Sequence, residues 1–121
     1  MIGVGLDLVD VDRFRNVLQR RHKIRDRLFT HEELLYCNSA MDPAERLAVR
    51  FAAKEAVMKA LGVGLGKIMF REIEITKDVT GKPGLQLHGS AAELATRNGV
   101  NKWHISLSHT TSTAEALVIA E

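Results

Sequence analysis

A single long helix, marked at both ends by the sequence, places the strongest constraint on how this chain can fold. Asp42 and Pro43 supply its start, because an acidic N-cap residue followed by proline at the first helical position is a common N-terminal signal. Gly62 supplies its end, since glycine readily takes the left-handed conformation that terminates helices. On a helical wheel, six apolar side chains form one stripe: Ala44, Leu47, Ala48, Phe51, Ala52 and Met58. The helix from 43 to 61 is therefore expected to pack into the core.

Glu55 lies at the centre of this apolar stripe. An ionised carboxylate buried there is costly unless a cation, hydrogen-bond donors or a proton compensates it. Lys59 follows one helical turn later on the same face, so an ion pair between Glu55 and Lys59 within the helix is one solution. The other solution is a functional site, in which a second acid joins Glu55.

Asp7 is the candidate for that second acid. Residues 2 to 8 alternate apolar side chains with Gly3, Gly5 and Asp7, which is the period-two pattern of a strand with one apolar face. An acid at the end of a strand is often only a turn residue before a helix, and that interpretation stays open. Together, however, Asp7 and Glu55 offer the hard carboxylate oxygens that suit Mg²⁺, whereas Zn²⁺ would favour His or Cys as well.

The other patterns predict an α+β fold in which a mainly antiparallel sheet packs on the long helix. We expect further helices at 11–20, at about 31–38 behind a capping box of Thr30 and Glu33, and after a cap formed by Ser90 with Glu93. Strands are expected in a hairpin around 73–75 and 85–87, then at 103–109 and 114–119. The length is that of one compact domain, 1–121.

Basic residues are concentrated in one segment, although the net charge of the chain is only +2. Residues 13–27 carry seven Lys and Arg side chains against Asp26 alone, a net charge of +6, and the remainder of the chain carries −4. Such an asymmetry predicts a surface that meets an acidic partner, either an acidic protein or nucleic acid. A solvated basic face without a partner is the plainer alternative.

Two further segments are candidates for binding phosphate. The loop from Gly62 through Gly64 to Lys67 could present backbone N–H groups and a cation, although it lacks the P-loop pattern, and Arg50 and Lys59 add cations along the helix. In His104 to His109, Ile105 and Leu107 point one way, while His104, Ser106 and Ser108 form a polar face.

Several classes of protein are poor explanations. No apolar stretch reaches the roughly 18 residues that a membrane span needs, and Met1 is followed by no basic leader, so we expect a soluble cytosolic protein. Cys37 is the sole cysteine, which excludes an intrachain disulfide. Cys37 also has no evident base beside it, so nothing supports covalent catalysis.

Four segments carry a family resemblance: Gly5–Asp7 (GLD), Arg50–Ala60 (RFAAKEAVMKA) with Gly62–Gly64 (GVG), Gly81–Pro83 (GKP) and His104–His109 (HISLSH). Together they resemble the holo-acyl-carrier-protein synthases, the short group of the 4′-phosphopantetheinyl transferases. The resemblance covers almost the whole chain, and the long helical segment is its most specific part. The fold of that family agrees with the one expected above.

The resemblance implies transfer of the phosphopantetheine arm of coenzyme A to a serine of an apo acyl carrier protein, releasing adenosine 3′,5′-bisphosphate, for fatty acid biosynthesis. It implies that Asp7 and Glu55 hold Mg²⁺ and that Lys59 contacts the phosphates of coenzyme A, which makes these three the catalytic residues. Arg50, Gly62 and Gly64 belong to the matching segments and remain candidates for contacts with coenzyme A. The acceptor of the serine proton is expected to be Glu55, with Asp7 as the second choice.

The resemblance also implies partners. Ser108 and His109 resemble the family's contact for the 3′-phosphate of the nucleotide, and the strand that carries them should come from a neighbouring protomer of a trimer, with sites between subunits. The basic segment would dock an acidic carrier protein through Arg13, Arg20 and Arg21.

Two rival functions remain open. A small basic nucleic-acid-binding module would use the basic segment, but the chain has only six aromatic residues and no known nucleic-acid motif, and that function leaves Glu55 unexplained. A Mg²⁺-dependent phosphate or nucleotide hydrolase would use the acids and cations but would not explain the basic segment. We expect neither a nucleic acid nor a membrane as a partner.

Overall fold

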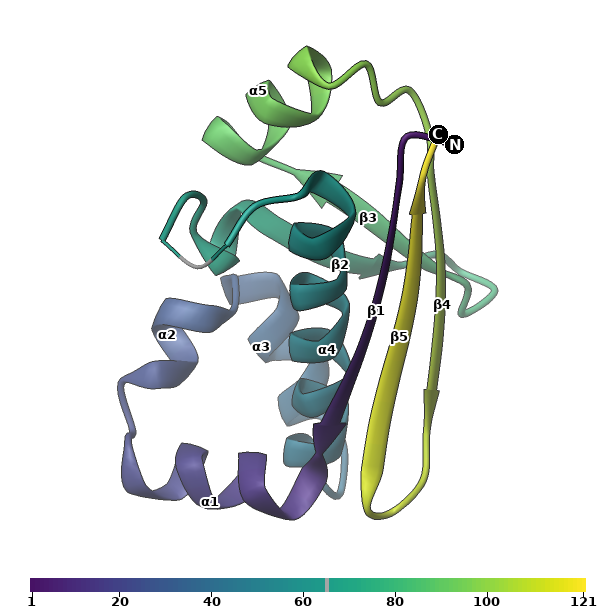
Figure 1. Ribbon diagram of the computed structural model, residues 1–121. Helices are drawn as coiled ribbons and strands as arrows, with labels where there is room; N and C mark the ends of the chain where they lie inside the picture. Colours follow the sequence, from purple (N-terminus) through teal and green to yellow (C-terminus); the bar gives the residue numbers. More distant parts are fainter. Residues whose placement is uncertain (65) are drawn as a thin grey trace.

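The long helix and a three-stranded antiparallel sheet lie against each other at the centre of the fold (Figure 1). The computed structural model describes residues 1–64 and 66–121. Helix α4 spans Pro43–Leu61, and the sheet contains β1 (Gly3–Asp10), β5 (Thr113–Ala120) and β4 (Trp103–His109), in the order β1-β5-β4. The α+β class and the packing of antiparallel strands on one long helix are therefore confirmed. Gly62 has the left-handed conformation expected of it and caps α4.

Strand β1 crosses α4 at very close range because it carries glycine where it meets the helix. A Cβ atom at Gly5 would collide with the carbonyl oxygen of Ala56, and one at Gly3 would collide with that of Ala60. Asp7 is the next residue on this buried side of the strand. The apolar side chains of β1, Val4, Leu6 and Leu8, point to the other side and are at least half exposed.

Smaller elements surround α4 (Figure 1). Helices α1 (Val11–Arg20), α2 (Ile24–Leu28) and α3 (His31–Asn38) share one apolar cluster with the first half of α4. A second apolar cluster lies against the C-terminal half of α4. It is enclosed by the hairpin of β2 (Ile73–Lys77) and β3 (Pro83–Leu87). A short 3₁₀ helix, η1 (Phe70–Glu72), precedes this hairpin, and α5 (Gly89–Arg97) follows it. Within the described residues, no helix is both long and apolar enough to cross a membrane.

Local predictions about these smaller elements had mixed outcomes. The capping box of Thr30 and Glu33 is present, with the Glu33 N–H donating to Thr30 Oγ1. The predicted cap by Ser90 and Glu93 is wrong, because the N-cap of α5 is His88, two residues earlier, and the helix begins at Gly89. Ser90 donates instead to the carboxylate of Glu72. The sequence analysis also missed α2, a helix of only five residues within the basic segment.

A buried ion pair fastens the hairpin to α4. Lys54 Nζ lies 2.7 Å from Glu33 Oε1 and also donates to the carbonyl oxygens of Phe70 and Ile73, while Glu33 Oε2 accepts the N–H of Ile75. Both charged side chains are fully buried. Burial lowers the pKa of Lys54, opposed by the charge of Glu33. Because each charge has a partner and further hydrogen bonds, the pair can be accommodated in the core.

Candidate active site

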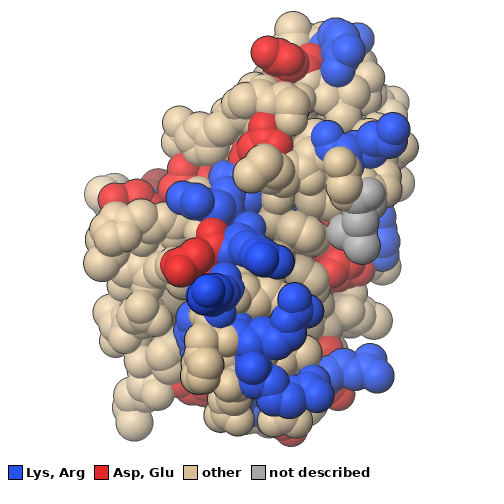
Figure 2. Space-filling view, turned by 90° about the vertical axis from the view of Figure 1, so that its left-hand side faces the viewer, with Lys and Arg blue, Asp and Glu red and all other residues tan. Residues whose placement is uncertain are grey.

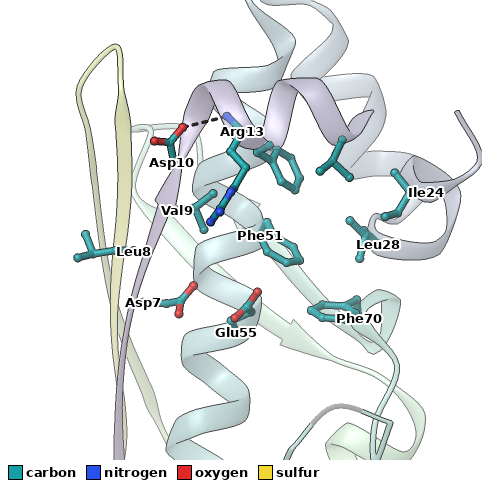
Figure 3. A pocket seen from close by; sticks show the side chains of 12 residues that line it. Asp7, Leu8, Val9, Asp10, Arg13, Ile24, Leu28, Phe51, Glu55 and Phe70 are labelled. Carbon is teal, nitrogen blue, oxygen red and sulfur yellow. Dashed lines mark hydrogen bonds between the residues drawn. The ribbon is translucent and has the colours of Figure 1, made fainter. Parts of the chain in front are cut away.

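Asp7 and Glu55 line the same cavity, which has a volume of about 450 Å³ and opens beside α1 (Figure 3). Asp7 comes from the middle of β1, not from its end, and Glu55 comes from the facing side of α4. The N-cap of the following helix is Asp10, whose side chain accepts the N–H of Arg13, so Asp7 is not the turn residue that precedes a helix. The structure thus brings together the two acids that the sequence analysis paired.

The surroundings of Glu55 make negative charge on its carboxylate unfavourable. Burial raises the pKa of Glu55, the nearby charge of Asp7 raises it further, and Lys59 acts in the opposite direction. The Lys59 ammonium lies 2.9 Å from Asp7 Oδ1 and 2.9 Å from the carbonyl oxygen of Leu6. Lys59 therefore pairs with Asp7 across the strand–helix contact, and not with Glu55 along the helix.

The chemistry of the acid pair suits a cation with few protein ligands. Two carboxylates facing one cavity repel each other, and an added cation would relieve that repulsion. Mg²⁺ commonly takes only one or two carboxylates from the protein and leaves its remaining positions for water and phosphate oxygens. Over residues 1–64 and 66–121, no group of three or more His, Cys, Asp and Glu side chains is placed to hold a metal. The donor set therefore fits Mg²⁺ better than Zn²⁺.

The wall of the cavity beyond the acids is apolar. Phe14 and Phe51 stack with ring centroids 5.0 Å apart, and Phe51 stacks in turn on Phe70 at 5.4 Å. Ile24 and Leu28 of α2 complete the wall. The sequence analysis missed this wall, although the spacing of aromatic residues along α1 and α4 was a signal that could have indicated it.

Arg50 lies in a different place from the acids. Its guanidinium stacks over the ring of Tyr36, 4.5 Å from the centroid, beside Arg46 at 4.6 Å, and Lys77 lies 5.4 Å from the same ring. Arg50 is buried, and its Nε has no hydrogen-bond partner within the described residues. Arg50, Tyr36 and Lys77 border a second cavity, next to Gly81 of the β2–β3 hairpin. The sequence analysis did not single out Tyr36.

The other candidate contacts for coenzyme A are exposed and lie outside the acid cavity. Gly62 and Gly64 follow the end of α4; Leu65, in the middle of the predicted phosphate loop, lies outside the described residues. Ser108 is on the polar, outward side of β4, as predicted from its alternation. His109 ends that strand and contacts Glu45 at the start of α4. Within a single chain, Ser108 and His109 therefore lie apart from the cavity of the two acids.

Lys and Arg side chains gather over the face formed by α1 and α2 (Figure 2). Arg13 lines the acid cavity itself. Arg20 and Arg21 are exposed at the end of α1, and Arg21 borders a shallow depression together with Lys23 and Arg27. The basic segment of the sequence is thus a continuous surface next to the two acids.

Comparisons with known proteins agree with this fold. The sequence profile described as the 4′-phosphopantetheinyl transferase superfamily matches residues 3–118. A holo-[acyl-carrier-protein] synthase of Streptomyces avermitilis is 45% identical over 121 residues, covering 100% of this chain and 98% of its own length.

Solved structures give the same result. The holo-[acyl-carrier-protein] synthase of Neisseria meningitidis superposes with a TM-score of 0.92 at 35% identity, covering 100% of this chain and 98% of its own. The Helicobacter pylori synthase, in complex with coenzyme A, superposes with a TM-score of 0.86 at 29% identity, covering 98% of this chain and 99% of its own. By sequence and by fold, the chain belongs to the 4′-phosphopantetheinyl transferase superfamily, in its family of holo-[acyl-carrier-protein] synthases.

Proposed function

We propose that this protein transfers the 4′-phosphopantetheine group from coenzyme A to a serine of apo acyl carrier protein, as one transferase domain acting in the cytoplasm in fatty acid biosynthesis. The observation that carries the proposal is the shared cavity of Asp7 and Glu55, with Lys59 paired to Asp7 at its edge. Membership of the synthase family supplies the reaction, and the cavity supplies groups suited to it.

Asp7 and Glu55 would hold Mg²⁺ through their carboxylate oxygens. The bound ion would neutralise charge on the pyrophosphate of coenzyme A. Lys59 is suited to the same oxygens, because its side chain is 54% exposed while that of its partner Asp7 is only 10% exposed. The ammonium can therefore turn from Asp7 towards a phosphate while it stays in contact with water, and bound Mg²⁺ would compensate the charge of Asp7.

The reaction forms a bond between the serine oxygen and the β-phosphorus and breaks the bond from that phosphorus to the leaving bisphosphate. The serine hydroxyl must lose its proton as it attacks. Glu55 is our choice for the acceptor and Asp7 the second choice, because both carboxylates line the cavity in which the serine would react.

The nucleotide end of coenzyme A would lie between two protomers. Gly62 and Gly64 would approach the phosphates with their backbone, and Arg50, Ser108 and His109 would contact the nucleotide. Since Ser108 and His109 lie outside the acid cavity of their own chain, we propose that they complete the coenzyme A site at the acids of a neighbouring copy.

An apolar surface is available for that assembly. The sheet side turned away from α4, here called the outer sheet face, carries the side chains Val4, Leu6, Leu8, Leu117 and Ile119. Leu6 and Leu117 are direct neighbours across β1 and β5, and both are exposed. No described element covers this face (Figure 1). We propose that three copies bury it together as a homotrimer, since contiguous exposed apolar patches mark interaction sites.

The carrier protein would dock on the basic face of α1 and α2 (Figure 2). That face adjoins the acid cavity through Arg13, so an acidic partner held there can present its serine to Glu55. A Mg²⁺-dependent hydrolase needs no such surface, and a nucleic-acid-binding module needs no pair of acids; both remain as outcomes of the first test below.

The transfer itself can be tested by mass. Incubation of the protein with coenzyme A, Mg²⁺ and an apo acyl carrier protein should add one phosphopantetheinyl group to the carrier, as measured by intact-mass spectrometry, and a chelator should prevent the addition. Glu55→Gln should fold normally and lose transfer by at least about 100-fold, the typical contribution of a general base. Hydrolysis of coenzyme A without carrier modification would favour the hydrolase instead.

Glu55 should also govern stability in the metal-free protein. Its pKa is raised above the ordinary 4.5 in the folded state, so the folded state binds more protons in the window between the two values. The contribution of Glu55 to the free energy of unfolding therefore falls as pH rises through that window and then stays low. Urea unfolding in chelator should show Glu55→Gln more stable than the parent at pH 7, with the gain lost below pH 4.5.

The exposed Glu93→Gln is the matched control and should show no such gain. Equal stability of Glu55→Gln and the parent at every pH would contradict this account of the acid pair.

The docking surface can be tested apart from the chemistry. Arg20→Glu combined with Arg21→Glu should raise the KM for the carrier by about tenfold or more and weaken its salt dependence, because the two changes reverse charges that attract an acidic partner. Both residues lie outside the acid cavity, so the chemistry should not be affected. The KM for coenzyme A should not change, and neither should transfer by the control Arg97→Glu on α5. A rise in the KM for coenzyme A would show that this surface has another use.

The trimer depends on the outer sheet face. Leu6→Asp should yield monomers in sedimentation experiments, because a charge at the centre of a buried apolar interface is strongly disfavoured. Met41→Asp, at a fully exposed apolar side chain outside the sheet, should leave the assembly intact. If the sites lie between subunits, mixed assemblies of Glu55→Gln with His109→Ala should regain transfer, because some sites combine the two intact halves. An assembly that survives Leu6→Asp would overturn the interface.

A further inference from the structure

A cation of the chain itself lies on one of the two acids. The Lys59 ammonium donates to Asp7 Oδ1 at 2.9 Å and to the carbonyl oxygen of Leu6 at 2.9 Å. The contact joins the last turn of α4 to the middle of β1, 52 residues apart in the sequence. Two oxygens of the strand therefore hold Lys59 where the strand passes the helix.

This ammonium supplies part of the compensation that a divalent cation would supply. Asp7 and Glu55 line one cavity (Figure 3). Burial raises the pKa of Glu55, as does the charge of Asp7, whereas the charge of Lys59 opposes both effects. A metal ion that used Asp7 Oδ1 would have to displace the ammonium, and one that used the other oxygen would bind beside a positive charge. In either position, the lysine disfavours the metal.

Lys59 can leave Asp7, but only a new anion makes its departure favourable. The Lys59 side chain is 54% exposed, so the freed ammonium would be solvated, while the carboxylate of Asp7, which is 10% exposed, stays at the cavity. A hydrogen bond between two charged groups is among the stronger ones in proteins, and a metal that bound alone would break it. The pyrophosphate of coenzyme A would offer the ammonium other charged oxygens. The loss is thus compensated when metal and nucleotide bind together.

We propose that Lys59 is an internal competitor for the metal site: its ammonium holds Asp7 against a divalent cation until the pyrophosphate of coenzyme A draws it away. The inference rests on the proposed function, which places the metal on Asp7 and Glu55. A metal that bridges the acids and the nucleotide would couple their binding by itself. Lys59 adds to this coupling by weakening the binding of the metal alone, and linkage makes the effect reciprocal.

Manganese binding measures the competition without catalysis. Mn²⁺ favours the same oxygen ligands as Mg²⁺, and its electron paramagnetic resonance signal falls when it binds to protein. Without coenzyme A, Lys59→Met should bind Mn²⁺ at least about tenfold more tightly than the parent, because a charge-assisted hydrogen bond no longer has to be broken. Adding Asp7→Asn to Lys59→Met should abolish this gain. Lys102→Met, at an exposed lysine of another segment, is the matched control and should bind Mn²⁺ like the parent.

Coenzyme A without carrier protein supplies the second half of the measurement. It should raise the affinity of the parent for Mn²⁺, and the factor of this increase should be at least about tenfold smaller in Lys59→Met, which has lost both the competition and the contact with phosphate. Lys59→Arg keeps a cation and should retain most of the increase. An affinity for Mn²⁺ without coenzyme A that is equal or weaker in Lys59→Met would overturn the inference.

Nitrogen-15 spectra of the lysine ammonium groups separate competition from a charge that acts only at a distance. A hydrogen-bonded ammonium exchanges its hydrogens with water slowly enough to be observed, and the signal of Lys59 is identified by its absence in Lys59→Met. Saturation with Mg²⁺ alone should remove or shift this signal, because the ammonium leaves Asp7. A signal that saturating Mg²⁺ leaves unchanged would show that Lys59 stays on Asp7 and would overturn the competition.

The inference and the proposed function can fail separately. If neither the parent nor Lys59→Met binds Mn²⁺ even with coenzyme A, the metal site on Asp7 and Glu55 fails, and the competition fails with it. If transfer to the carrier requires Mg²⁺ but Lys59→Met leaves the affinity for the metal alone unchanged, only the competitor role of Lys59 fails.

Discussion

The close contact of β1 with α4 is the constraint on which the rest of the structure depends. Only glycine at positions 3 and 5 lets the strand lie directly on the carbonyl oxygens of Ala56 and Ala60. That approach brings the next inward residue, Asp7, into the cavity that Glu55 lines, so the spacing of the acid pair is a consequence of backbone packing and not of a mobile loop. Side chains positioned by rigid elements keep their geometry, which a site for in-line transfer requires.

Burial separates the roles of two lysines on the same helix. Lys54 is completely buried, and its bonds to Glu33 and to two carbonyl oxygens fasten the β2–β3 hairpin to α4. Removing one partner of such a pair would leave an uncompensated charge in the core, so Lys54 cannot leave its position. Lys59, one and a half turns later, is more than half exposed and bound at the edge of the cavity. In the proposed function, Lys59 is the cation that would exchange the carboxylate of Asp7 for a phosphate, because water would solvate its ammonium during the change.

The sequence predicted the elements that carry strong local signals and missed those that depend on distant packing. Pro43 and Gly62 marked α4 because starts and ends of helices are set by nearby residues, and the wheel position of Glu55 required a partner. Asp42 is the N-cap residue as predicted, but its side chain makes no capping hydrogen bond and accepts one from Arg15 instead. Alternation showed that β1 has two unlike faces, but it could not show that the face with glycine and Asp7 is the buried one. Arg50 was predicted to be a phosphate-binding cation along the helix, and no local pattern showed that it lies against the ring of Tyr36, from another helix. Contacts of that kind depend on the order of elements in space, which local patterns do not contain.

The exposure of the apolar side of β1 is connected with the proposed division of the site between two copies. An isolated chain gains nothing by exposing Val4, Leu6 and Leu8, and their exposure therefore favours the proposed assembly, which would bury this face. The same face carries Ser108 on β4, beside the strand end at which His109 contacts Glu45. An assembly that buries the outer sheet face therefore brings these polar groups towards a neighbouring chain. The glycines of β1 turn its apolar side outwards, and this one feature provides both the acid pair and the surface through which another copy can complete the site.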